Sequence, residues 1–172
     1  MIFRSKKIET FVIPPSLGTF SVRLIFGYGI DKPRFIVIGI QAKPNNVADD
    51  QFNNSIFNVP TNNLPRQIDV KKITTTLNNK IITTDYVNNL SRNEAARWYN
   101  DFKNFRKSYY GDMGEDDLVD YHDYINLYRL YVLDLSKQPE LTTYGTANIR
   151  LDFEWNKTTP QNYTTSVYVP SF

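Results

Sequence analysis

Cysteine is absent from this chain of 172 residues, histidine occurs once, and the seven glycines form no glycine-rich loop. The lack of cysteine excludes disulfides and thiolate chemistry, and it favours a reducing compartment. A single imidazole is too few for a zinc site. His122 next to Asp123 offers only half of a catalytic triad, because no serine lies in a nucleophile-elbow context, so we expect a surface histidine. The sequence predicts neither an enzyme nor a bound cofactor.

Long hydrophobic segments and a marked charge excess are also missing. The longest apolar runs, such as residues 35–40, fall far short of the ~20 residues that a membrane-spanning helix needs. The basic start of the chain leads into a segment that Glu9 and Thr10 interrupt, so it predicts no signal peptide. With 20 Lys plus Arg against 18 Asp plus Glu, the net charge of +2 indicates no particular partner. We expect a soluble protein of the cytoplasm or nucleus, with no membrane partner.

The most regular pattern present is an alternation of apolar and polar residues between positions 147 and 156. The apolar side chains are Ile149, Leu151, Phe153 and Trp155, and the charged ones between them are Arg150, Asp152 and Glu154. A period of two with charges at every second position is typical of a strand with one buried and one solvated face.

Eight segments rich in Val, Ile, Thr, Tyr and Phe predict strands, because these residues suit a pleated, half-buried surface. They cover residues 8–13, 20–27, 34–41, 68–77, 80–84, 127–135, 147–155 and 163–169. Residues 35–38 are apolar on both faces, so we expect a central, covered strand that buries Ile36 and Ile38.

Two local features are predicted between the fourth and fifth of these strands. Asn78 and Asn79 tolerate the left-handed backbone that a two-residue hairpin turn requires. Along residues 68–77 the apolar positions change parity, which predicts a β-bulge near Lys71 and Lys72.

One segment is helical by its periodicity. Ser91 and Glu94 form a capping box, which predicts where the helix begins. The residues that then recur at spacings of three and four are Ala95, Trp98, Tyr99, Phe102 and Phe105. We expect this helix to end near Gly111 and a shorter helical turn to follow over residues 117–124.

The order of strands, helix and strands predicts an all-β fold, mainly β with one or two helices, arranged as an antiparallel β-sandwich or jelly roll. The length suits a single domain over residues 1–172. Residues 45–67 are interpreted as a long surface loop. The predicted structural core includes Ile36, Ile38, Trp98, Phe102, Ile149, Leu151, Phe153 and Trp155.

Two groups of acidic residues are candidates for chemistry. Asp152 and Glu154 share one face of a strand, which would suit a pair of glycosidase carboxylates, but alternating charge is typical of any solvated strand face. The second group is the loop with Asp112, Glu115, Asp116 and Asp117. Its oxygens suit Ca²⁺, yet the spacing is not that of an EF-hand and the acids also suit the start of a helix. We expect both groups to be structural and predict no metal site.

Basic and aromatic residues alternate along the predicted helix, namely Arg97, Trp98, Lys103, Phe105, Arg106, Lys107 and Tyr109. Such a series is able to bind nucleic acid, but an amphipathic helix with its rings in the core explains it better. The 12 Tyr and 11 Phe of the chain exceed what a small monomer needs, which predicts a homo-oligomer. The interface candidates are Tyr109 and Tyr110, together with residues 45–67.

Five collinear stretches carry a resemblance to a known family. They are KPRFIVIGIQ at 32–41, the strand of 70–78 that ends in Leu-Asn, the aromatic residues within 99–111, VLDLSKQ at 132–138 and IRLDFE at 149–154. In this order and spacing, residues 32–169 resemble the C-terminal region of double-jelly-roll major capsid protein-like proteins, found as virus-derived genes in arthropods and in related DNA viruses.

The resemblance implies eight strands in two facing sheets, a helix after a mid-fold strand and trimeric capsomers. It further implies a structural protein that assembles with itself and with other capsid subunits, located in the virion and in the cytoplasm or nucleus before assembly. The full proteins carry two jelly rolls, whereas this length holds one. A fragment, a split gene product and a single-jelly-roll relative all remain open.

Two other classes of function compete with a capsid subunit. A lectin-like binding module of β-sandwich fold predicts a monomer or dimer with sugar affinity. A carboxylate-based hydrolase requires a concave site with strongly perturbed acids.

Overall fold

The computed structural model describes residues 7–26, 33–44, 70–86, 92–111, 119–126, 128–136, 138, 146–155 and 163–171. The strands are β1 Lys7–Ile13, β2 Thr19–Phe26, β3 Phe35–Pro44, β4 Val70–Leu77, β5 Lys80–Tyr86, β6 Leu130–Asp134, β7 Ala147–Trp155 and β8 Tyr163–Ser171. The helices, α1 Arg92–Tyr110 and α2 Tyr121–Asn126, lie between β5 and β6 in the sequence. Neither of these two described helices is long and apolar enough to cross a membrane.

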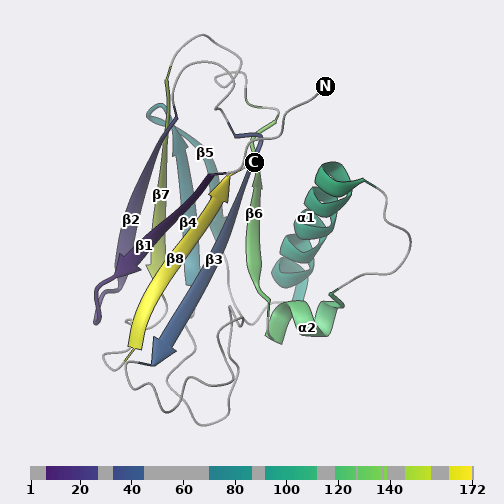
Figure 1. Ribbon diagram of the computed structural model, residues 1–172, viewed down its shortest axis with the longest axis horizontal. Helices are drawn as coiled ribbons and strands as arrows, with labels where there is room; N and C mark the ends of the chain where they lie inside the picture. Colours follow the sequence, from purple (N-terminus) through teal and green to yellow (C-terminus); the bar gives the residue numbers. More distant parts are fainter. Residues whose placement is uncertain are drawn as a thin grey trace.

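The strands form two antiparallel sheets of four. Sheet A has the order β1-β8-β3-β6 and sheet B the order β2-β7-β4-β5, and sheet A lies in front of sheet B in Figure 1. The chain changes sheet after every strand from β1 to β8, except at the β4–β5 hairpin. This arrangement is a jelly-roll β-sandwich, as the strand pattern predicts.

The core fills the space between the sheets. Along β7 the inward residues are buried while the residues between them reach solvent, which is the predicted alternation. In sheet A, Ile36 and Ile38 are fully buried and pair with Leu133 and Tyr131 of β6. The opposite face of β1 carries Ile8 and Val12, which are 56% and 62% exposed.

The hairpin and the bulge have clear structural causes. Asn78 and Asn79 adopt φ angles of 47° and 71°, which allow the tight turn between β4 and β5. Asn78 Oδ1 also accepts a hydrogen bond of 2.9 Å from the Asn148 amide, so the turn is tied to β7. The register of β4 on β7 shifts between Val70 and Lys72, where the parity change predicts a bulge. Both predictions are confirmed.

The region between the helices and β6 differs from the prediction. The second helix covers Tyr121–Asn126, and the strand begins at Leu130 rather than at residue 127. The cause is local capping, because the carboxylate of Asp120 accepts a hydrogen bond of 2.7 Å from the Asp123 amide and starts the helix there. The Tyr128 amide then bonds to the Asp123 carbonyl at 3.1 Å and delays the strand.

Candidate assembly surface

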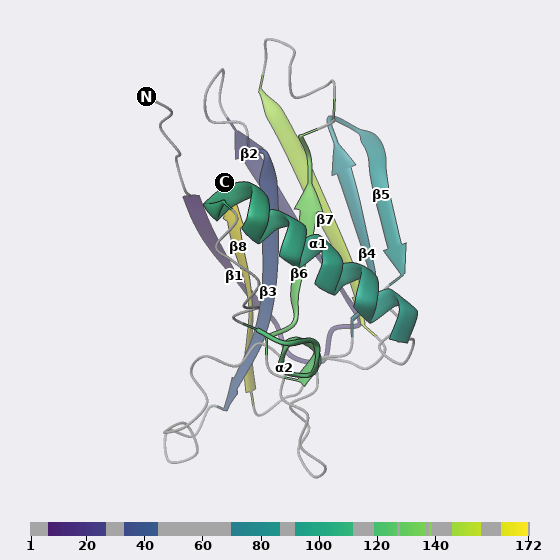
Figure 2. The same ribbon diagram turned by 90° about the vertical axis from the view of Figure 1, so that its right-hand side faces the viewer.

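Helix α1 covers the β6 edge of the sandwich (Figure 2). The ring of Trp98 meets Tyr131 edge-on with centroids 5.1 Å apart, and Phe105 meets Phe35 at 5.2 Å. Tyr131 pairs with Ile38, which is on the inward face of sheet A, whereas Phe35 is on the outward face. Because α1 contacts residues of both faces, it wraps the edge of sheet A and shields β6 from pairing with another strand.

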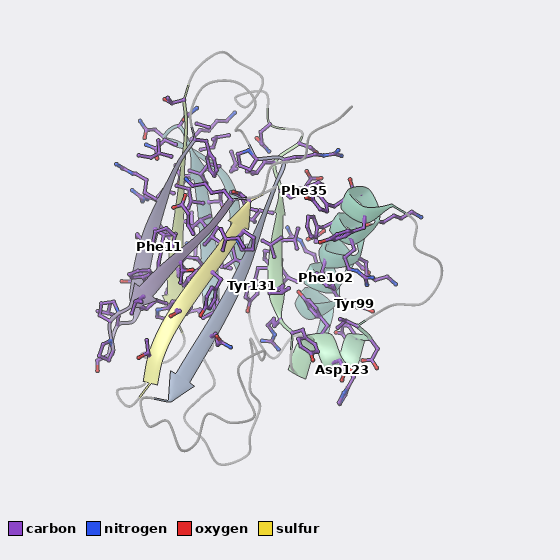
Figure 3. All side chains as sticks on the ribbon, in the orientation of Figure 1. Phe11, Phe35, Tyr99, Phe102, Asp123 and Tyr131 are labelled. Atoms are coloured by element: carbon purple, nitrogen blue, oxygen red, sulfur yellow. The ribbon has the colours of Figure 1, made fainter. Side chains whose placement is uncertain are left out.

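All eight predicted core residues are buried. Ile36, Ile38, Ile149, Leu151, Phe153 and Trp155 lie in the strands, and Trp98 and Phe102 lie on α1. Phe102 packs against Tyr124 of α2 with ring centroids 5.5 Å apart, so the two helices share one aromatic contact region, which lies beside β6 in Figure 3.

Tyr124 is the most perturbed titratable group in this contact region. It is fully buried, and its hydroxyl donates a hydrogen bond of 2.6 Å to the Leu130 carbonyl. Burial is the main reason that the pKa of Tyr124 lies far above its ordinary value near 10. Tyr124 therefore stays neutral and fastens α2 to the start of β6.

The substitution Tyr124→Phe tests this role through pH. Losing the hydrogen bond should lower the free energy of unfolding by about 1 kcal/mol at neutral pH. Above pH 10 the unfolded tyrosine ionises while the folded one does not, so the wild type loses about 1.4 kcal/mol per pH unit from this group. The stability gap between the two proteins should therefore narrow above pH 9 and close between about pH 10 and pH 11 in denaturant titrations. A constant gap would contradict a buried neutral phenol.

The predicted interface residues lie at the end of α1. Tyr109 is half-buried and stacks on Phe105 with centroids 5.6 Å apart, while Tyr110 meets Tyr109 edge-on at 4.8 Å. Tyr110 itself is 60% exposed. A continuous series of rings, Phe35, Phe105, Tyr109 and Tyr110, thus runs from sheet A to the surface. We call it the aromatic series.

Two basic residues of α1 lie over rings that already pack inward. Lys103 Nζ is 5.5 Å from the Tyr99 ring centre, and the Arg106 guanidinium is 6.0 Å from that of Phe102. Because Phe102 is buried and Tyr99 half-buried, these rings offer no open face of the kind that stacks on bases.

The carboxylates of Asp152 and Glu154 are engaged with neighbours on the outer face of sheet B. Arg150 Nε lies 2.8 Å from Asp152, and Ser21 Oγ donates to the same carboxylate. Lys71 Nζ bonds to Glu154, which holds the pKa of that carboxyl below its usual value. Sequence alternation alone does not reveal Ser21 and Lys71, because strand register brings them there.

A small cluster of titratable side chains surrounds the start of α2. Asp120, His122 and Asp123 have ligand atoms within 4.8 Å of one another. The His122 side chain is 83% exposed, and Asp120 caps the helix, so capping explains the cluster. The acidic loop with Asp112 and Glu115, like residues 45–67, lies outside the described residues.

A groove of about 280 Å³ lies between α1 and sheet A, and sequence patterns give no sign of it. Its lining residues are Arg34, Phe35, Asp101, Asn104, Phe105, Ser108, Val132 and Asp134. The volume is just below the range of ~300–1,000 Å³ that is usual for small-molecule sites. One cation, Arg34, and two carboxylates, Asp101 and Asp134, thus line the same groove, beside the aromatic series.

Comparison with known protein families gives a match. A family model described as "Double jelly roll-like domain" matches residues 1–169. Searches of curated proteins and of solved structures found no match.

Proposed function

Because the chain belongs to the double jelly roll-like domain family, we propose that it is a structural subunit of a capsid or capsid-like shell. The observation that carries this proposal is the agreement of the family match with the strand orders β1-β8-β3-β6 and β2-β7-β4-β5. The partners would be further copies of this chain and other capsid subunits, and the location would be the virion, reached from the cytoplasm or nucleus.

The function would depend on packing and not on bond-making chemistry. The two sheets enclose one apolar core, and α1 covers its β6 side. The sandwich is therefore a close-packed unit whose outer faces are able to contact other subunits. A stable contact between such units needs about 800 Å² from each partner.

The mass distribution of the purified protein tests the proposal. Light scattering over a range of concentrations, followed by negative-stain microscopy of any large fraction, should give capsomers or shells. A monomer of 20.1 kDa at every concentration, alone and with other capsid subunits, would contradict self-assembly.

Tyr110 is the residue of the predicted interface that is best suited to mutagenesis. Tyr110→Ser removes an exposed ring, so folding should be unchanged while assembly weakens about tenfold, as loss of a moderate interface contact implies. Light scattering and thermal melting measure the two effects separately.

Ile81→Ser is the matched control, because Ile81 is 62% exposed on β5 of sheet B. If both variants assemble like the wild type, Tyr110 lies outside the interface. The Tyr109→Ser, Tyr110→Ser double variant is less selective, since Tyr109 also packs on Phe105.

A further inference from the structure

Within the described ranges, the outer edge of β1 is an open hydrogen-bonding edge of sheet A. In the part of the chain that the structure describes, β1 pairs with β8 alone, and no described helix or strand lies beyond it in Figure 2. One edge of an antiparallel strand always presents backbone N–H and C=O groups away from its neighbour. An extended segment of another chain is able to form hydrogen bonds with this row of backbone groups by adding a strand to the sheet.

The outward face of β1 lacks the charges that usually protect an edge. Ile8, Thr10 and Val12 occupy it, and all three are exposed. Among the other edge strands, β2 carries the exposed Arg23, β5 begins with the exposed Lys80, and β6 is covered by α1. Charged residues and covering helices discourage pairing with another chain. Strand β1 also begins with an exposed lysine, Lys7, but none of the outward residues that follow it in the strand is charged.

The sequence of β1 is complementary to itself in the antiparallel direction. The strand runs from Lys7 to Ile13, so its central residue is Thr10. Pairing two copies about Thr10 places Ile8 opposite Val12 twice and Thr10 opposite Thr10. Pairs of β-branched residues and Thr–Thr pairs are favourable across strands, and no like charges face each other directly. Glu9 and Lys7 already form an ion pair at 2.6 Å within each strand.

We propose that two copies of this chain join through β1, antiparallel about Thr10, so that their sheets A form one continuous sheet. The inference rests on the proposed self-assembly and names one of its contacts. A strand of seven residues buries less than the ~800 Å² per partner of a standard interface. The contact is accordingly weak alone and becomes effective when other contacts of an assembly hold the copies together.

A charge at Val12 tests the contact. Val12→Lys places an ammonium group opposite Ile8 of the second copy at two symmetric positions, and self-association should weaken about tenfold. Ile25→Lys is the matched control, because Ile25 is 61% exposed on β2, an edge strand of sheet B. Sedimentation velocity over a concentration series measures both, and circular dichroism checks folding.

A cysteine at the proposed axis gives a second, independent readout. The chain has no cysteine, so Thr10→Cys introduces a single thiol. Directly opposed residues of antiparallel strands have Cα atoms ~4.5–5.5 Å apart, which is within disulfide range. Mild oxidation with diamide should cross-link Thr10→Cys into a dimer and leave Ile25→Cys largely monomeric.

The outcomes separate this contact from self-assembly in general. Selective weakening by Val12→Lys together with selective cross-linking of Thr10→Cys supports the β1 contact. The β1 contact is overturned if the wild type oligomerises, Val12→Lys and Ile25→Lys self-associate to the same extent, and Thr10→Cys does not cross-link. The capsid proposal stands in that case. If the wild type is monomeric at every concentration, alone and with other capsid subunits, both are overturned.

Discussion

Leu151→Asp is expected to yield no folded protein. Leu151 is fully buried on β7, where it pairs with Val22 of β2 on one side and Thr75 of β4 on the other. An ionised carboxylate at this position would cost several kcal/mol even after relaxation. That is comparable with the ~5–15 kcal/mol that stabilises a typical domain. Circular dichroism and gel filtration of the expressed protein measure the result.

The neighbourhood of Leu151 offers little compensation to a charge. Within the described residues, the Thr75 hydroxyl is buried without a hydrogen-bond partner, and one donor cannot replace the hydration of a carboxylate. Ile25→Asp is the control, because it makes a similar change at an exposed position of β2 and should shift stability by only about 0.5 kcal/mol. A soluble Leu151→Asp protein that melts like the wild type would show that β7 does not bury this face.

Trp98→Ala should detach α1 from the sandwich. Trp98 is 3% exposed and is packed against Tyr131, so its removal leaves a cavity beside β6. Truncating a buried tryptophan costs about 3–5 kcal/mol, which for a chain of this size lowers the melting temperature by roughly 6–20 °C. A free β6 edge should also make the variant prone to aggregate.

The fluorescence of the Trp98→Ala variant distinguishes detachment of α1 from global unfolding. The chain has two tryptophans, and Trp155 in the sandwich core remains to report global unfolding. Arg97→Ala, at the exposed neighbouring position, should change stability by no more than about 0.5 kcal/mol. Equal melting temperatures for Trp98→Ala and Arg97→Ala would contradict the role of α1 as a cover for the edge.

The sequence predicts features that depend on local chemistry. Strand β7 begins and ends where its alternation begins and ends, because one face is buried along its whole length. The turn at Asn78 and Asn79 follows from their tolerance of positive φ. The sequence predicts that β8 ends at residue 169, because Pro170 lacks an N–H group and argues against a strand. The strand nevertheless continues to Ser171, which pairs with Ile36 of β3.

Features that depend on distant partners are not readable from periodicity. The pattern along α1 identifies Trp98 and Phe102 as buried, but it does not reveal that the helix wraps the β6 edge. The groove beside Asp134 and the pairing of Ser21 with Asp152 arise from the same cause, which is the placement of segments far apart in the chain. The open edge of β1 likewise follows from strand order and not from the sequence of β1.

The pairing of β1 with β8 also determines when the molecule is able to fold during its synthesis. The Ser171 hydroxyl bonds to the Lys7 carbonyl across 164 positions of sequence, and every β1 partner lies on β8. At ~5–20 residues per second, the ribosome needs roughly 8–30 s to make the intervening chain. During that time the nascent strand β1, which carries the apolar Ile8 and Val12, lacks β8, the strand with which it pairs in the folded protein. Sheet A therefore reaches its complete strand order only after β8 has been synthesised.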